Sequence, residues 1–199
     1  MLDYSHLSPP KMEAVGPWFR VHQTVNGAVF FGRTGKYRWD SPNHTYGVLY
    51  GGESWEAAFL ESVLHDPVKK TVLKSELEKR SMGLLKTNTP LQLIDLSDGT
   101  VLRDLGLTES ETQARAYKKT QGISEAIHDA GWNVHGIRYA SRLDPNRLCM
   151  ALFDCPTGMI AVNDLEPLLA PSNDGLLRFT LKHYRIPLIE DLTNPNASW

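Results

Sequence analysis

The fold is decided by Lys36 to His65, which reads KYRWDSPNHTYGVLYGGESWEAAFLESVLH. This stretch contains a strand-like run, Tyr46 to Tyr50, followed by the glycine pair Gly51-Gly52 and a helix pattern that begins at Ser54. A strand that feeds a helix through two glycines brings its last side chains and the first helical turns around one crevice. The sequence therefore predicts a functional crevice at this strand–helix junction.

Three side chains are expected to meet in that crevice. Arg38 precedes the strand, Tyr50 lies at its end, and Glu61 lies in the helix. A guanidinium group binds phosphate oxygens through forked hydrogen bonds, and a carboxylate can hold a sugar hydroxyl. This combination suits an anionic substrate that carries a sugar.

The helix predicted from Ser54 to about His65 has Ser54 as its N-cap and carries Glu61 opposite an apolar stripe. The stripe consists of Trp55, Phe59 and Val63. The small side chains of Ala57 and Ala58 beside Glu61 leave space above the carboxylate that a ligand could fill. Taken alone, however, the pattern favours an ordinary solvated surface glutamate.

The composition predicts a single globular domain over residues 1–199, with an N-terminal arm over 1–16 and a loose tail over 193–199. The hydrophobic fraction of 41% and charged fraction of 22% are ordinary for globular proteins. A net charge of −2 without long basic runs argues against direct nucleic-acid binding and against a membrane-surface protein. No apolar run approaches the ~18 residues that span a bilayer, so we expect a cytoplasmic protein.

Strand and helix patterns alternate irregularly along the chain. Strand patterns cover 18–22, 91–96, 136–142 and 148–153, with weaker ones at 159–162 and 176–188. Helix patterns cover 73–85 and 112–130, besides the one that follows Gly52. Because no regular strand–helix repeat is present, the sequence predicts an α+β fold rather than a doubly wound sheet.

Familiar catalytic motifs are absent from the sequence. It contains no phosphate-binding glycine loop, no G-x-G-x-x-G and no G-x-S-x-G, and its histidines lack paired metal-ligand spacing. A carboxylate pair drawn from Glu53, Glu56 and Glu61 is weak, because these residues point in different directions on a helix. What remains is a set of polar residues at strand ends and on the helix: Arg20, Arg38, Tyr50, Glu61 and Ser141.

These residues lie in short stretches that together resemble the RES-domain family, which is named for an arginine, a glutamate and a serine. The matching stretches are Phe19-Arg20-Val21, Arg38 to Pro42, Val48-Leu49-Tyr50, Ala57 to Glu61, Leu93 to Leu96, Gly136 to Arg142 and Leu148 to Phe153. The likeness covers about Trp18 to Asp154. Asp40 stands where the family often has asparagine, and His135 where aspartate is frequent. Both could alter substrate placement, but neither removes a named catalytic position.

The resemblance implies a fold similar to the ADP-ribosyltransferase toxins, with two small sheets clasping NAD and helices around them. It implies an NAD phosphorylase or NAD glycohydrolase, which breaks the bond between nicotinamide and ribose by phosphorolysis or hydrolysis. NAD would be consumed as substrate, with inorganic phosphate as a candidate co-substrate and no cofactor or metal. The family further implies a toxin, an antitoxin partner with an Xre-like helix-turn-helix domain, and a homodimer.

The same resemblance implies roles for the five residues. Glu61 would stabilise the oxocarbenium-like ribose, and Arg20 and Arg38 would hold the pyrophosphate or admit inorganic phosphate. Tyr50 would stack on nicotinamide, and Ser141 would bind its ribose or amide. Two alternatives stay open: transfer of ADP-ribose to a protein, and a non-catalytic nucleotide-binding module.

Overall fold

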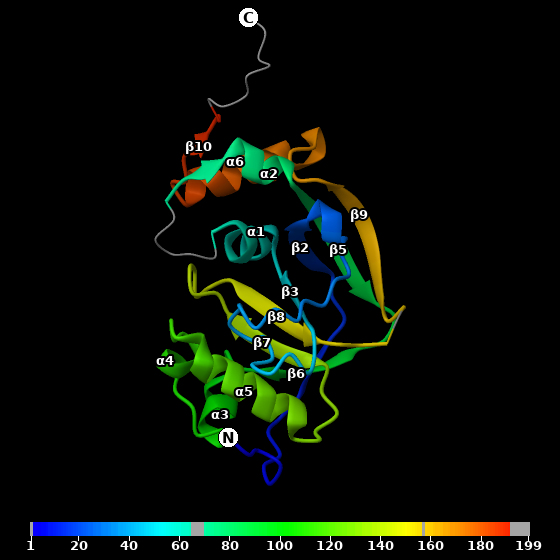
Figure 1. The fold of residues 1–199 in the computed structure, drawn as a ribbon, viewed down its shortest axis with the longest axis vertical. Helices are drawn as coiled ribbons and strands as arrows, with labels where there is room; N and C mark the ends of the chain where they lie inside the picture. The colour runs from blue at the N-terminus through cyan, green and yellow to red at the C-terminus, as the bar shows by residue number, and fades with distance from the viewer. Residues whose placement is uncertain (1, 65–69, 157, 192–199) are drawn as a thin grey trace, which may run out of the picture.

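The computed structural model describes residues 2–64, 70–156 and 158–191 and is built around a curled sheet with the strand order β1-β6-β7-β8-β3-β2-β5-β9 (Figure 1). The mixture of strands and helices confirms the α+β class. The eight strands are β1 Met12–Ala14, β2 Trp18–Gln23, β3 Val48–Gly52, β5 Arg80–Thr87, β6 Leu91–Asp95, β7 Gly136–Ala140, β8 Leu148–Phe153 and β9 Ile160–Pro167. Two short strands, β4 Val72–Leu73 and β10 Leu188–Ile189, form a separate parallel pair.

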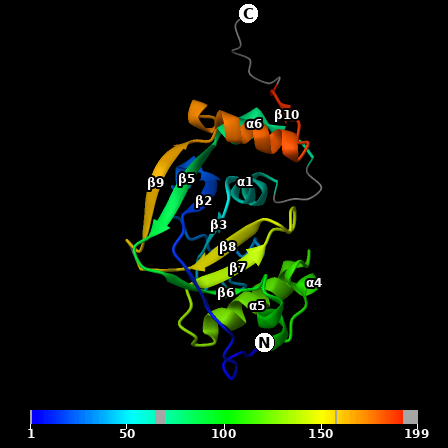
Figure 2. The same ribbon diagram turned by 180° about the vertical axis from the view of Figure 1, so that it is seen from behind.

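The helices cover the two ends of this sheet and its middle. They are α1 Trp55–Val63, α2 Lys74–Glu78, α3 Gly99–Asp104, α4 Glu109–Thr112, α5 Tyr117–Asp129 and α6 Asp174–His183. In Figures 1 and 2, α3, α4 and α5 gather beside β6 and β7, whereas α2 and α6 lie at the opposite end of the molecule. Helix α1 lies between these two groups, so one helix is central to the fold.

The sheet consists of two parts that meet between β2 and β3. Strand β3 pairs with β8 over the whole of Val48–Gly52, and β2 pairs with β5 over Trp18–Gln23. Between β2 and β3 the register contains the single pair Phe19↔Gly52. The two small sheets expected from the sequence are therefore two lobes of one sheet, and we call their boundary the β2–β3 junction.

Two elements differ in type from the sequence expectations, and the helix expected over 112–130 begins only at Tyr117. The helix expected over 73–85 ends at Glu78, and the chain continues as strand β5. Strand β5 lies between β2 and β9 in the sheet. Its consecutive residues Ser81 to Gly83 are all buried, so it lacks the alternation of buried and exposed residues that marks a strand in a sequence. The strand expected over 176–188 is instead mostly helix α6, in which Leu177 and Thr180, three residues apart, share the buried face.

The N-terminal arm takes part in the sheet, because β1 pairs antiparallel with β6 and Tyr4 is buried in the core. The tail expected over 193–199 and the helix end at His65 lie outside the described residues. Within the described ranges, no helix is both long and apolar enough to cross a membrane.

The glycine pair explains how α1 reaches its position. A Cβ atom on Gly52 would lie 2.5 Å from the backbone nitrogen of Ala58, and one on Gly51 would lie 2.7 Å from the terminal methyl of Met150. Ser54 caps the helix by accepting a hydrogen bond from the Ala57 nitrogen, as the sequence predicts. Helix α1 therefore packs directly against the end of β3.

We expect Gly52→Ala to lower the free energy of unfolding by about 1–3 kcal/mol, because the new methyl group must displace α1 backbone rather than a flexible side chain. Gly122→Ala in α5 is the matched control, since nothing lies within 4 Å of its added Cβ. That substitution should stabilise the protein by up to about 1 kcal/mol through helix propensity. Urea unfolding followed by circular dichroism measures both, and an unchanged midpoint for Gly52→Ala would contradict the packing described here.

Candidate active site

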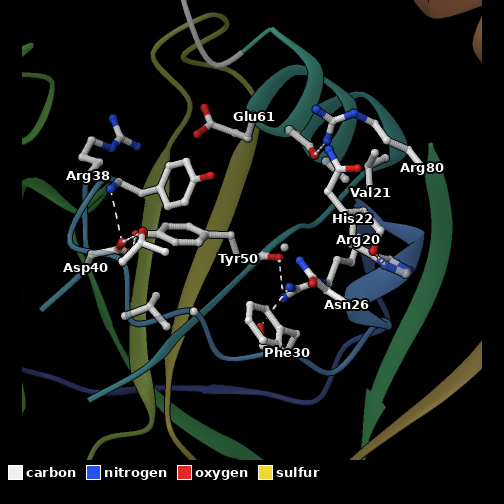
Figure 3. A pocket seen from close by; sticks show the side chains of 18 of the residues that line it. Arg20, Val21, His22, Asn26, Phe30, Arg38, Asp40, Tyr50, Glu61 and Arg80 are labelled. Carbon is white, nitrogen blue, oxygen red and sulfur yellow. Dashed lines mark hydrogen bonds between the residues drawn. The ribbon is translucent and has the colours of Figure 1, made fainter. Parts of the chain in front are cut away.

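A cavity of about 290 Å³ lies beside the β2–β3 junction and is lined by residues of β2, β3, α1 and the loop before β3. Four of the five residues singled out from the sequence line it: Arg20, Arg38, Tyr50 and Glu61. Figure 3 shows Arg20 and Arg38 at opposite ends, with Tyr50 between them and Glu61 projecting from α1. Ser141 does not line the cavity.

Arg20 is a buried cation on strand β2, with 8% of its surface exposed. Its guanidinium group donates to the backbone oxygens of Tyr50, at 3.3 Å, and Phe30, at 3.0 Å. Burial lowers its pKa to about 10, so the group stays protonated at neutral pH. No carboxylate among the described residues forms an ion pair with it, so an anionic ligand would offset the cost of this buried charge.

Arg38 is the second buried arginine, with 5% of its surface exposed. It donates to the Gln113 side-chain oxygen at 3.1 Å and to the backbone oxygen of Ala140 at 3.1 Å. Its guanidinium carbon lies 4.3 Å from the centre of the Tyr139 ring. As with Arg20, no ion pair to a carboxylate occurs within the part of the chain that the structure describes. Both ends of the cavity thus carry unneutralised positive charge.

The Tyr50 hydroxyl is fully engaged by its neighbours. It donates to Asp40 Oδ1 at 2.9 Å and accepts from the Trp39 backbone nitrogen at 3.0 Å. Burial and the adjacent Asp40 carboxylate raise the pKa of Tyr50 well above its usual value, so the phenol stays protonated. Tyr50 therefore offers its ring, rather than an acid or base, to a ligand.

The Glu61 carboxylate accepts a hydrogen bond from Ser141. The fully buried Ser141 hydroxyl donates to Glu61 Oε1 at 2.7 Å and accepts from the Leu143 backbone nitrogen at 3.2 Å. The face of α1 around Glu61 is not a solvent face, because Ala57 and Ala58 beside it are buried. The resemblance implies that Ser141 contacts a ligand. In this structure its hydroxyl instead orients the Glu61 carboxylate.

Several lining residues are not among the five candidates from the sequence. Asp40 organises the loop that carries Arg38, since its Oδ2 accepts from the Thr34 hydroxyl and the backbone nitrogens of Lys36 and Tyr37. Arg80 enters the cavity from β5 and donates to Ser62 Oγ at 2.9 Å. It lies just beyond the true end of a mispredicted helix, so no sequence signal marked it.

His22 also lines the cavity, at the same end as Arg20, Asn26 and Arg80 (Figure 3). Its Nδ1 lies 2.9 Å from the Gln23 backbone oxygen, which can only accept, so Nδ1 carries the proton. Burial, assisted by the charge of Arg20, lowers the pKa of His22. His22 follows Arg20 by two residues on β2, so the two side chains lie on the same face of the strand, but the sequence did not single out His22.

The cavity combines anion-binding arginines, an aromatic ring and an oriented carboxylate. Among the described residues, no group of three or more His, Cys, Asp or Glu side chains is placed to hold a metal ion. The site can therefore bind a phosphorylated, ring-containing ligand with a carboxylate directed at it.

Comparisons with known proteins agree with this geometry. The RES domain family model matches residues 17–169, whereas no curated protein matches the chain in sequence. The fold is similar to that of the MbcT toxin in the crystal structure of the M. tuberculosis MbcT-MbcA toxin-antitoxin complex. The TM-score is 0.68 at 16% identity, covering 85% of this chain and 92% of that chain. This likeness shows that the two chains share a fold, in agreement with the fold class expected from the sequence.

The depressed pKa of His22 makes stability depend on pH. In the unfolded chain, histidine has its reference pKa of about 6.5. In the folded state the pKa of His22 is lower, so just below pH 6.5 the unfolded state binds a proton at His22 and the folded state does not. The free energy of unfolding should therefore fall as the pH is lowered from about 7.5 to about 5.5. The free energy of unfolding of His22→Gln should fall less over the same range. Urea unfolding of both proteins at these two pH values measures the difference, and parallel losses would show that His22 is not involved.

Proposed function

The chain belongs to the RES domain family, and we propose that it is an enzyme that breaks the bond between nicotinamide and ribose in NAD. One observation carries this proposal: two buried arginines without a carboxylate partner among the described residues line the same cavity as the serine-held Glu61. The arginines match the pyrophosphate of NAD, and the carboxylate matches the positive charge that develops on its ribose.

The two arginines can serve different phosphates, because they lie at opposite ends of the cavity (Figure 3). One holds the pyrophosphate of NAD, and the other admits an incoming phosphate ion. The ring of Tyr50, fixed through its hydroxyl, stacks on the nicotinamide between them.

The reaction requires little acid catalysis at the leaving group. The C1′–N bond of the ribose breaks and its electron pair passes to the positively charged nicotinamide nitrogen, which leaves neutral. Glu61 stabilises the cationic ribose carbon while an oxygen atom of phosphate or water bonds to it. Hydrogen phosphate can attack without first losing a proton, whereas water must give up one, and Glu61 can take it. NAD is consumed as substrate in either case.

The test is to incubate the purified protein with NAD, with and without phosphate and with a candidate protein acceptor. NAD loss that requires phosphate identifies a phosphorylase, loss in its absence a glycohydrolase, and a labelled protein an ADP-ribosyltransferase. No NAD loss under any condition would contradict the proposal and leave a nucleotide-binding module.

Glu61→Gln should lower turnover by about a thousandfold or more, because the amide keeps an acceptor for the Ser141 hydroxyl but loses the negative charge. Glu56→Gln is the matched control on the same helix, since Glu56 does not line the cavity, and it should turn over NAD at close to the wild-type rate. Initial rates of nicotinamide release measure both variants. Wild-type turnover by Glu61→Gln would show that the carboxylate has no catalytic role.

We also propose that the protein is a toxin with an antitoxin partner, supported by the likeness to MbcT, which was solved in complex with MbcA. The expected partner is a small protein with an Xre-like helix-turn-helix domain, and a homodimer of the toxin is part of the same proposal. Expression of the wild-type chain should arrest bacterial growth, whereas Glu61→Gln should not. Co-expression of a helix-turn-helix protein encoded beside it should restore growth and co-purify with the chain. Normal growth on wild-type expression alone would contradict the toxin role.

A further inference from the structure

We propose that Tyr37, at the mouth of the cavity, is the surface on which the second base of the dinucleotide, the adenine, stacks. This inference rests on the proposed function and adds a subsite for the half of NAD that does not react. Tyr37 lines the same cavity as Glu61 and Arg38, yet 47% of its surface is exposed.

The size of the cavity requires such an outer subsite. At about 290 Å³ it lies just below the range for small-molecule sites, roughly 300–1,000 Å³. NAD carries two bases, two riboses and two phosphates. With the nicotinamide half enclosed between Tyr50 and Glu61, the adenosine half must extend towards the open end.

Tyr37 is presented by a fixed loop. Its backbone nitrogen donates to Asp40 Oδ2 at 3.2 Å, and its backbone oxygen accepts from the Gln121 side chain at 2.9 Å and from the Asp40 nitrogen at 3.2 Å. An exposed aromatic ring on an anchored backbone can bind a base with little loss of conformational entropy. Substitution of the side chain leaves these backbone contacts in place.

The rings of Tyr37 and Tyr50 point in different directions. Their centroids are 5.9 Å apart and their planes meet at 68°, so one planar ligand cannot stack on both. Tyr50 is the inner ring, fixed to Asp40, and Tyr37 is the outer one. Two aromatic faces at a steep angle suit a ligand with two separate planar rings.

Phe30 and Tyr117 are competing aromatic side chains at the cavity wall, and the face of Tyr117 is already used. The Arg142 guanidinium carbon lies 5.1 Å from the centre of the Tyr117 ring, and Arg142 donates to its hydroxyl at 2.9 Å. Tyr37 has no such cation over its ring among the described residues. Phe30 lies at the Arg20 end of the cavity (Figure 3). Tyr37, in contrast, belongs to the anchored loop that also carries Arg38. The outer base is therefore assigned to Tyr37.

The test compares NAD with its two halves, AMP and nicotinamide mononucleotide, in wild type, Tyr37→Ala and Tyr37→Phe. Tyr37→Ala should raise the KM for NAD and the inhibition constant of AMP by about tenfold or more, the size expected for loss of one base–aromatic stack. Nicotinamide mononucleotide gives a KM if it is cleaved and an inhibition constant if it only competes. In either case this constant should change less than about twofold. Tyr37→Phe keeps the ring and should match wild type for all three ligands.

Two outcomes would overturn the inference while leaving the proposed function intact. If Tyr37→Ala raised the constant for nicotinamide mononucleotide as much as that for AMP, Tyr37 would contact the reacting half of NAD. If it left the inhibition constant of AMP unchanged, the adenine would bind elsewhere. A wild-type protein that neither cleaves nor binds NAD would instead overturn the proposed function, and this is measured before any variant is made.

Discussion

The contact between Gly52 and the first turns of α1 determines where the chemistry can take place. Because Gly52 has no side chain, the backbone at Ala58 can approach the end of β3 closely enough that an added methyl group would overlap it. The next turn of the helix then carries Glu61 over the cavity, where the buried Ser141 hydroxyl meets it from the end of β7. A bulkier residue at this position would move the carboxylate away from both the serine and the arginines.

The charges in the cavity are unevenly distributed, and this asymmetry defines the class of ligand. Arg20 and Arg38 are held by backbone and amide oxygens, which orient a guanidinium group without neutralising it. Asp40 also lines the cavity, but its two oxygens accept hydrogen bonds from Tyr50 and from the loop before it. Glu61 is thus the carboxylate presented to a ligand, and an anion that fits between the arginines completes the electrostatics.

The sequence was sufficient where a residue's role follows from local pattern. The alternation in β2, the glycine pair and the Ser54 cap placed the principal strands and helix correctly, and four of the five candidate residues line one cavity. It failed where neighbours decide the conformation. Strand β5 is buried on both faces at Ser81 to Gly83, so its sequence does not alternate there, and Arg80 at its start was missed with it. Gln113, which orients Arg38, lies in a break between α4 and α5 that helix periodicity cannot show.

Because the β2–β3 junction is narrow, a ligand bound across it would affect the rigidity of the molecule. The lobes share one register pair, Phe19↔Gly52, and the hydrogen bond from Arg20 on one lobe to the Tyr50 backbone on the other adds to it. A ligand that reaches both Arg20 on one lobe and Arg38 on the other would bridge this junction. Such a ligand would restrict relative motion of the lobes without altering their shape.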